Sequence, residues 1–194
     1  MFQNLKADLR RYGTNLMPRH AQLRSITDCY GFQATAVYRF GKWVEATFHP
    51  PVAGPLRWIL LTVHACLSYF ICRAYGIRID RRAVIGQGLY IGHFAGIVVG
   101  PCHIGENCSI HQHVRLEEGA RGGRHGGPTI GHHVWIGAHS HIIGPVVVGN
   151  QSAVSAGSVV TDDVQPRALV VGRPARVVNP NYDNAALLGA EPEA

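Results

Sequence analysis

Residues 79–116, IDRRAVIGQGLYIGHFAGIVVGPCHIGENCSIHQHVRL, carry an aliphatic side chain at every sixth position, with one extra residue before Ile104. The series resumes after one interruption, and neither an α-helix nor an ordinary strand has a period of six. The aliphatic positions are Ile79, Ile85, Ile91, Ile97, Ile104, Ile110, Leu116, Ile130, Ile136, Ile142, Val148, Val154 and Val160.

A period of six can pack if each hexapeptide forms one short strand and one corner of a triangular coil of roughly eighteen residues. The aliphatic side chains then point to the axis, so we predict a mainly β protein, a parallel β-helix. The expected coil starts are Ile79, Ile97, Leu116 and Ile142. The pattern resembles that of hexapeptide repeat proteins, and this resemblance implies a left-handed helix, a homotrimer and an acyltransferase activity.

We expect three regions along the chain: an N-terminal helical module (1–75), the β-helix domain (76–166), and a C-terminal cap and tail (167–194). Within the β-helix, the glycine-rich segment EEGARGGRHGGPT (117–129) stretches the aliphatic spacing. It must therefore leave the solenoid as a loop, and such loops commonly carry function. The polar tail after the cap is expected to be loosely ordered.

The helical module contains three segments with helical character, at 5–13, 26–48 and 58–72, and the breaker HPPVAGP precedes the third. The third segment, WILLTVHACLSYFIC, is apolar but shorter than the about 20 residues that a bilayer span needs. Two interpretations stay open. The segment is a buried helix that docks the module on the β-helix and on neighbouring subunits, or it lies in the membrane interface as a peripheral contact.

Composition restricts the partners and the compartment. The net charge is +6, but Lys and Arg are scattered and no helix-turn-helix or aromatic stacking platform is present, so we expect no nucleic acid. Five cysteines without a CxxC pattern indicate buried thiols in a reducing compartment. The N-terminus has no apolar signal segment, so we expect a cytoplasmic protein, with association to the inner face of the cell membrane as a further hypothesis.

The predicted coils stack His93, Gln112, Ala138 and Ala156 in one column, because each lies two places after the start of a third hexapeptide. Imidazole is suited to act as the general base of an acyl transfer, since its pKa lies near operating pH. We therefore assign catalysis to His93, against the alternative of a surface histidine at a coil corner. Cys102 and Cys108 are interpreted as core residues rather than acyl-carrying nucleophiles.

The small residues of the column would leave backbone amides open to an extended pantetheine chain. Basic residues just past the last repeat suit a polyphosphate. The predicted cofactor-binding residues are Gly137, Ala138, Ala156, Gly157, Arg173 and Arg176.

Three stretches carry a specific resemblance. GQGLYIGHFAGIVVG (86–100) resembles the segment around the catalytic histidine of the serine O-acetyltransferase family. GRPARVV (172–178) is similar to the closing signature of that family, and AVYRFGKW (36–43) to its helical element. The resemblance implies acetyl-CoA as donor, His93 as general base and a cofactor site in the trimer groove. It also implies acceptor contacts from Arg124 and His125 in the loop, and Gln112 is the third predicted acceptor contact.

The chain departs from that family at two places. The serine-specific enzymes have aspartates fifteen residues before the histidine and directly before it, where this chain has Arg78 and Gly92. The orienting carboxylate could come from Asp80, Glu117 or Glu118, or be missing. We therefore expect a sugar acceptor, small or lipid-linked, and a closer resemblance to the exopolysaccharide acetyltransferases of the colanic acid type. The alternative is a serine O-acetyltransferase of cysteine biosynthesis.

Histidines are concentrated in the repeats, including the pairs His111/His113 and His139/His141. Alternate residues of a strand point to one face, so a zinc enzyme resembling the γ-carbonic anhydrases is a remoter alternative. An inactive scaffold is another. Because the closing signature favours coenzyme A, no metal is expected.

Overall fold

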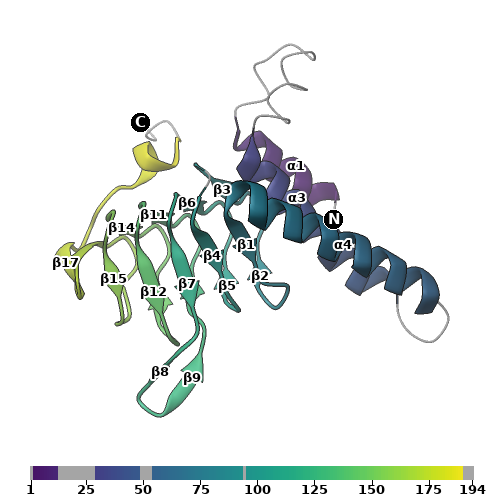
Figure 1. Ribbon diagram of the computed structural model, residues 1–194. Coiled ribbons are helices and arrows are strands. Elements are labelled where there is room, and N and C mark those ends of the chain that lie inside the picture. Colours follow the sequence, from purple (N-terminus) through teal and green to yellow (C-terminus); the bar gives the residue numbers. More distant parts are fainter. Residues whose placement is uncertain (1, 13–28, 49–53, 94, 190–194) are drawn as a thin grey trace.

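The computed structural model describes residues 2–12, 29–48, 54–93 and 95–189. It contains a triangular solenoid of short parallel strands with a group of helices at its N-terminal end (Figure 1). A parallel β-solenoid with an N-terminal helical region is therefore confirmed.

Each coil contributes one strand to each of three faces. The first face is a five-stranded sheet made of β1 (Ile77–Ile79), β4 (Ile97–Val99), β7 (Arg115–Glu117), β12 (His141–Ile143) and β15 (Val159–Val160). The second face is a four-stranded sheet made of β2 (Val84–Ile85), β5 (His103–Ile104), β10 (Thr129–Ile130) and β13 (Val147–Val148). The third face is a six-stranded sheet made of β3 (Tyr90–Ile91), β6 (Ser109–Ile110), β11 (Trp135–Ile136), β14 (Ala153–Val154), β16 (Leu169–Gly172) and the antiparallel β17 (Ala175–Asn179).

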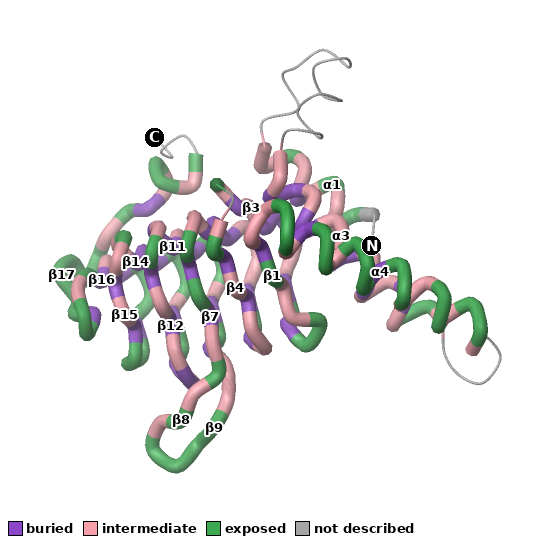
Figure 2. The backbone as a smooth tube through the Cα atoms, in the orientation of Figure 1, coloured by how far each residue is buried: buried purple, intermediate pink, exposed green. Residues whose placement is uncertain are grey.

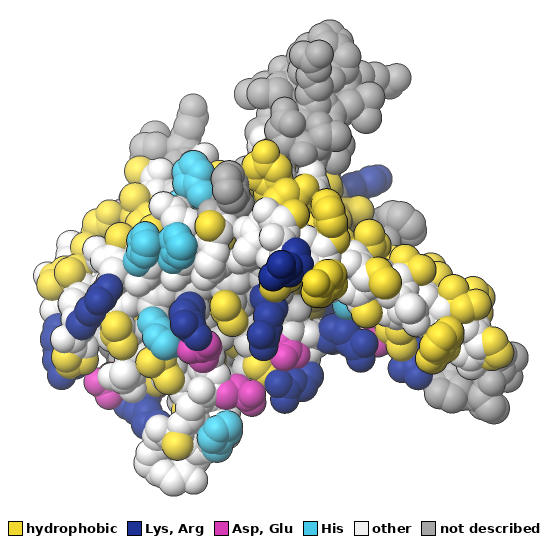
Figure 3. Space-filling model, in the orientation of Figure 1, with side chains coloured by type: hydrophobic (Ala, Val, Ile, Leu, Met, Phe, Trp, Pro, Cys, Tyr) yellow, Lys and Arg dark blue, Asp and Glu magenta, His cyan; other side chains and the backbone are white. Residues whose placement is uncertain are grey.

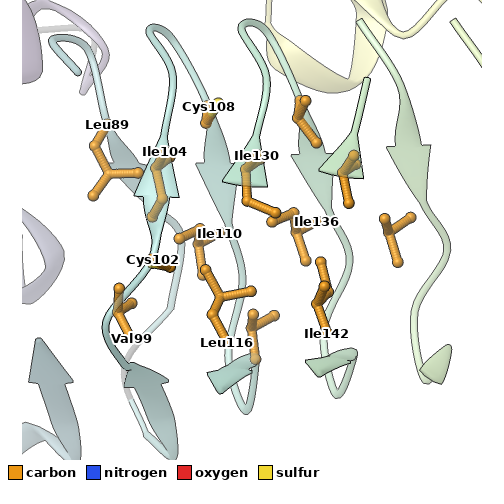
Figure 4. Close-up of a cluster of buried hydrophobic side chains, with 14 of the residues drawn as sticks. Leu89, Val99, Cys102, Ile104, Cys108, Ile110, Leu116, Ile130, Ile136 and Ile142 are labelled. Atoms are coloured by element: carbon orange, nitrogen blue, oxygen red, sulfur yellow. The ribbon is translucent and has the colours of Figure 1, made fainter. Parts of the chain in front are cut away.

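The aliphatic residue of each strand points to the axis and stacks on its equivalent in the next coil (Figure 4). Ile91, Ile110, Ile136 and Val154 are fully buried, and Leu116 and Ile142 are as well. This burial excludes water from a narrow core and supplies the main stabilising term of the solenoid.

The register corrects one predicted coil start. Ile79 pairs with Val99, whereas Ile97 pairs with Ile77. Val99 and not Ile97 is therefore in line with Leu116 on the first face. The error has a simple cause: both Ile97 and Val99 are buried in the core, so hydrophobicity alone could not separate them.

The interrupted coil expels its extra residues as an ordered hairpin. β8 (Gly119–Arg121) pairs antiparallel with β9 (Arg124–Gly126), and the hairpin projects from the end of β7, at the corner between the first and second faces (Figure 1). Gly122 and Gly123 at its tip both have positive φ, which glycine adopts without strain. The predicted loop is confirmed, and it has regular structure.

The helices are α1 (Phe2–Arg10), α3 (Tyr30–Thr47) and α4 (Gly54–Tyr75). The predicted residues 13, 26–28 and 49–53 lie outside the described part of the chain. α3 and α4 approach closely at Gly41, where a Cβ would lie 2.4 Å from His64 Nε2. Residues of α3 that face its neighbours are buried, as expected for a helix between two partners.

α4 is longer than the predicted helical segment 58–72. It is also less buried within its own chain than a docked helix would be. It has 22 residues, and of the helices in the described ranges it alone is long and apolar enough, by length and composition, to cross a bilayer. Within one chain only His64 and Ile71 are buried, while Trp58, Tyr69 and Phe70 are among its exposed apolar residues (Figures 2 and 3). One chain alone therefore buries little of α4, and docking that includes neighbouring subunits and contact with the membrane interface both stay predictions.

The helical module covers the open edge of the first coil. An uncovered edge would leave backbone groups without partners, and here side chains supply them. The contacts are Leu89 N–H to Asp8 Oδ1 (3.0 Å), Ile91 N–H to Tyr12 Oη (3.0 Å), Tyr38 O–H to the Ala83 carbonyl (2.8 Å) and Arg39 Nη1–H to the Ile85 carbonyl (2.6 Å). Asp8 and Arg39 also form a buried ion pair at 3.1 Å.

Residues 179–189 of the C-terminal tail pack against the solenoid, which corrects the expectation of a loose tail for this part. After β17 the chain returns along the third face to a 3-10 turn, η2 (Ala185–Leu188). Buried Asn184 donates from Nδ2 to the carbonyls of His133 (2.8 Å) and Ser152 (3.0 Å). These two bonds hold the tail against the solenoid. The rest of the predicted tail, 190–194, lies outside the described residues.

Candidate active site

The predicted column lies at one corner of the solenoid. We call the turns that follow β3, β6, β11 and β14 the third corner (residues 92–96, 111–114, 137–140 and 155–158). Ile91, Ile110, Ile136 and Val154 pair in register, so the predicted phase of these coils is confirmed. His93, Gln112, Ala138 and Ala156 therefore all lie at the third corner.

Coil one has a longer third corner than the later coils. His139 N–H bonds to the Gln112 carbonyl (2.9 Å), and His113 N–H bonds to the carbonyl of Ala95 (2.9 Å), not to that of His93. Counted back from the first face, Ala95 is thus the equivalent of Gln112. Ile91 and Val99 are eight positions apart, whereas their partners Ile110 and Leu116 are six apart, so two additional residues enlarge the connection that contains His93. The His93 side chain is exposed.

Left-handed residues line the same corner. Gly96, His113, His139 and Gly157 all have positive φ, and the imidazoles of His113 and His139 stack with centroids 4.5 Å apart. A Cβ on Gly96 would lie 2.2 Å from His113 Nδ1, so the glycine leaves room for the His113 ring in its present position. The stack gives the corner an aromatic edge that sequence reasoning did not assign to the site.

The predicted cofactor residues lie at the C-terminal part of this corner. Ala138 is partly exposed and Ala156 exposed, while a Cβ on Gly137 would lie 2.6 Å from Ala156 N. Arg173 donates from Nε to the Gly157 carbonyl, which places its guanidinium beside the column. Small side chains and a neighbouring cation are what an extended amide chain with a polyphosphate end requires.

Arg176 is held differently from Arg173. Its Nη1 donates to Asp162 Oδ2 (3.4 Å) and to its neighbour's carbonyl at Ala175 (3.0 Å). Its charge is therefore partly balanced by a carboxylate already present in the chain.

The predicted acceptor residues are not brought together within one chain. Gln112 lies at the third corner, whereas Arg124 and His125 lie on β9 in the hairpin, which leaves from a different corner (Figure 1). Both hairpin residues are exposed. They could reach a His93 only in a neighbouring copy of the chain.

Within one chain, none of the three suggested carboxylates contacts His93. Asp80 accepts hydrogen bonds from Arg82, and Glu118 lies 3.6 Å from Arg82. Glu117 is held at 2.6 Å by both Arg115 and His141. Over the described ranges, no hydrogen bond or ion pair joins these acids to the catalytic candidate.

A second imidazole adjoins His93. A Cβ on Gly92 would lie 2.7 Å from His111 Nδ1, so the absence of a side chain at position 92 lets the His111 ring lie against the backbone directly before His93. Burial, and next the nearby charge of His93, lower the pKa of His111. Two buried polar atoms here, His111 Nε2 and Gln112 Oε1, have no hydrogen-bond partner in the described structure. Buried polar atoms without a partner are uncommon in folded proteins.

The expectation of five buried thiols holds for two cysteines only, because Cys66 is exposed and Cys29 and Cys72 are half-buried. Cys102 and Cys108 are buried, and burial raises the pKa of Cys102 to about 12 and that of Cys108 to about 11. Thiols with such pKa values are poor nucleophiles. Across the residues that the structure describes, no group of three or more His, Cys, Asp or Glu is arranged to hold a metal ion.

Comparisons with known proteins agree with this geometry. Residues 127–162 match the family described as bacterial transferase hexapeptide (six repeats). A serine acetyltransferase of Synechococcus elongatus is 32% identical over 185 residues, which cover 92% of this chain and 69% of that protein. The serine acetyltransferase of Escherichia coli is 33% identical over 159 residues, 81% of this chain and 54% of its own length.

Solved structures give the same result. Soybean serine acetyltransferase complexed with serine has a TM-score of 0.72 at 32% identity, covering 91% of this chain and 68% of the soybean chain. Serine acetyltransferase from Brucella abortus in complex with coenzyme A has a TM-score of 0.73 at 26% identity, covering 92% and 68%. The chain thus spans about two thirds of these structures and about half of the E. coli enzyme.

These likenesses overturn one prediction. The exopolysaccharide assignment with a sugar acceptor is wrong, because the relatives and structures found are serine acetyltransferases. The prediction was based on Arg78 and Gly92, where carboxylates were expected. Two missing acids do not define the acceptor, since other side chains can form the site.

Proposed function

The chain belongs to the serine acetyltransferase family, and on that premise we propose that it transfers an acetyl group from acetyl-CoA to the hydroxyl of serine. The family membership confirms the predicted class, an acyl-CoA-dependent O-acetyltransferase with acetyl-CoA as donor. The observation that carries the acceptor proposal is the extent of the likeness to the cyanobacterial enzyme, which covers 92% of this chain. A match of that extent takes in the helical module as well as the repeats.

His93 is the proposed general base. It takes the proton of the serine hydroxyl as the oxygen attacks the thioester carbonyl of acetyl-CoA. The C–S bond breaks, the thiolate of coenzyme A leaves, and the proton from His93 returns to that sulfur. The products are O-acetylserine and free coenzyme A, and no acyl-enzyme is needed.

The groove along Ala138, Ala156 and Gly157 is the proposed donor site. Small residues there leave room and backbone groups for the pantetheine chain, and Arg173 lies next to the diphosphate end of such a chain. Arg176 is a weaker contributor, because Asp162 already takes part of its charge.

We also propose that the working assembly is a homotrimer with sites between subunits. The hairpin that carries Arg124 and His125 leaves from a corner remote from His93, so these residues can serve only a neighbour's site. Sedimentation should give a trimer, and a stable monomer would remove this role. In mixed trimers, an inactive His93→Ala chain and an inactive Arg124→Ala/His125→Ala chain should restore activity together.

A CoA-release assay tests the acceptor. L-serine should be acetylated with a kcat/KM above about 10⁴ M⁻¹s⁻¹, as for an ordinary enzyme on its own substrate. Mass spectrometry should find O-acetylserine in the same reactions. Release of coenzyme A with nucleotide sugars and none with L-serine would overturn the proposal.

A further inference from the structure

The hairpin of β8 and β9 projects from the solenoid and ends in a tip of two glycines (Figure 1). Its base is fixed by the backbone, because Gly144 N–H bonds to the carbonyl of Glu117 (2.9 Å), directly before the hairpin. The tip has no such support, since a Cβ on Gly122 or on Gly123 would meet nothing within 4 Å. A glycine tip in open space swings about its base unless a side chain holds it.

Arg121, the last residue of β8, supplies that second attachment. It donates from Nη1 to Asp163 Oδ1 (2.9 Å) and from Nη2 to Asp162 Oδ1 (3.2 Å). Among the described residues, these are the only side-chain hydrogen bonds between residues 119–126 and the rest of the chain. We call Arg121, Asp162 and Asp163 the hairpin clamp.

The two carboxylates of the clamp are themselves fixed. They follow β15 in the last coil, and Asp163 Oδ1 also accepts the N–H of Val147 (2.9 Å) on the second face. Asp162 has a second cation in Arg176, at 3.4 Å. A single exposed ion pair contributes little to stability, but a guanidinium shared between two positioned carboxylates forms a network, which holds its geometry better.

The register of the hairpin decides which side chains face the clamp. Arg121 lies directly opposite Arg124, and Ala120 lies directly opposite His125. Opposite residues share one face of a two-stranded ribbon, and successive residues alternate between its faces. Arg124 is therefore on the same face as Arg121, whereas His125 is on the other face.

Charge agrees with this division of the hairpin. Like charges directly opposite each other, such as Arg121 and Arg124, destabilise a ribbon unless carboxylates lie beside them. The pKa of Asp163 is lowered first by the hydrogen bond from Val147 and then by Arg121 and by the charge of Arg124. The face with the two arginines is thus turned to the carboxylates of its own chain, and the face with His125 is turned away from them.

We propose that Arg121 is a positioning residue for the acetyl transfer. By holding the hairpin tip on Asp162 and Asp163, it presents the His125 face in one fixed direction to the site of a neighbouring subunit. Arg121 acts through His125 and does not itself contact the substrates. This inference rests on the proposed function and on the proposed trimer.

Arg121→Gln removes the charge and releases the tip, so His125 loses its fixed position. The kcat/KM for L-serine should fall about tenfold, while the KM for acetyl-CoA stays within twofold. Arg121→Lys keeps a cation and should recover part of the loss. Arg81→Gln is the matched control, because it breaks an exposed ion pair of similar length, 3.0 Å to Glu45 on α3, outside the hairpin. An Arg121→Gln enzyme that acetylates L-serine as well as this control would overturn the inference.

A double-mutant cycle tests whether Arg121 acts through the two carboxylates. At saturating acetyl-CoA, Asp162→Asn/Asp163→Asn should lower the kcat/KM for L-serine about as much as Arg121→Gln does. All three changes together should lower it no further, because the clamp can be lost only once. Losses that add up independently would overturn the inference.

Tryptic cleavage tests the clamp without any acceptor. Trypsin cuts after arginine, and Arg124 is exposed beside the tip. In the Asp162→Asn/Asp163→Asn enzyme, mass spectrometry should show cleavage between Arg124 and His125 about tenfold faster than in the parent, because the tip opens more often. Glu45→Gln, which releases Arg81 instead, should leave this rate within twofold.

The two possible failures are distinguishable. An unchanged cleavage rate in the aspartate variant would overturn the clamp, whichever acceptor the enzyme uses. Faster cleavage in that variant, together with no acetylation of L-serine by the parent enzyme, would support the clamp and reject only the proposed acceptor.

Discussion

The later coils and the first coil are built by different rules. From Ile104 on, the aliphatic residues keep their period, the strands pair in register, and the one insertion leaves as a hairpin without disturbing the stack. The first coil has an enlarged third corner, and side chains from the helical module satisfy its open edge. The later coils can therefore be predicted from the repeat alone, whereas the first coil depends on contacts with the helical module.

This difference between the coils indicates which part of the solenoid can bind an extended ligand and which part can hold the catalytic residue. A regular corner repeats the same backbone in each coil, so it offers a continuous groove suited to an extended ligand. The enlarged corner brings His93 and His111 next to the nonrepeating helical module. Among the described residues, Arg11 and Tyr12 of the N-terminal region meet His111 beside this corner.

The largest effect should come from His93 itself. His93→Ala should lower kcat by about 10²- to 10⁴-fold, because the general base is lost, while binding of coenzyme A persists. His103→Ala, an exposed histidine of the regular second face, should stay within threefold of the parent. Single-turnover rates measured on both variants compare the two coils directly. A His93→Ala enzyme as fast as the His103 control would show that another group is the base.

The cover of the first coil should dominate stability. Asp8→Ala leaves Arg39 buried without its partner and Leu89 N–H without an acceptor, so we expect a loss of about 3–5 kcal/mol in the free energy of unfolding. Asn184→Ala, which releases the tail from the later coils, should cost about 1–3 kcal/mol. Urea unfolding of both variants measures the contrast. Equal losses would mean that the two ends of the solenoid are held alike.

A steric change in the regular groove should affect only the donor. Ala156→Leu places a side chain in the exposed groove rather than in the core, so the KM for acetyl-CoA should rise about tenfold, roughly 1.4 kcal/mol. Thr161→Leu, an exposed position after β15, is the control. If Ala156→Leu binds coenzyme A normally, the donor groove has been placed at the wrong corner.

The smallest effect should come from the outer surface of the later coils. Partial burial raises the pKa of Glu117, but hydrogen bonds from Arg115 and His141 outweigh this effect and bring the pKa below its ordinary value. Because the pKa of Glu117 is lower in the folded than in the unfolded state, its ionised form stabilises the fold at pH values above the unfolded pKa of about 4.3. This stabilisation is lost as the pH falls through the folded pKa. Glu117→Gln should therefore cost at most about 1 kcal/mol at pH 7. Its deficit in thermal unfolding should shrink as pH falls below about 4.3, and a deficit that stays constant would reject this explanation.

Sequence patterns could predict the solenoid because its rule is local. The six-residue period of Ile85, Ile91, Ile104 and Ile110 needs no knowledge of distant residues, and the expulsion of the glycine-rich segment follows from the same count. The pattern failed between Ile97 and Val99, where two buried aliphatic residues compete for one register position. It also failed for the tail, since a single buried Asn184 orders it through bonds to distant carbonyls.

By itself, the sequence determined the parallel solenoid, the third corner as the place of His93, and the small residues of the groove. These follow from a repeat in which each residue's environment depends on its neighbours six and about eighteen positions away. Only the tertiary structure decided what meets His93. Arg11 and Tyr12 reach the third face because α1 covers the first coil. Contacts between segments 79 or more positions apart, such as Tyr12 with Ile91, have no periodic signal, so they arise only when the chain is packed.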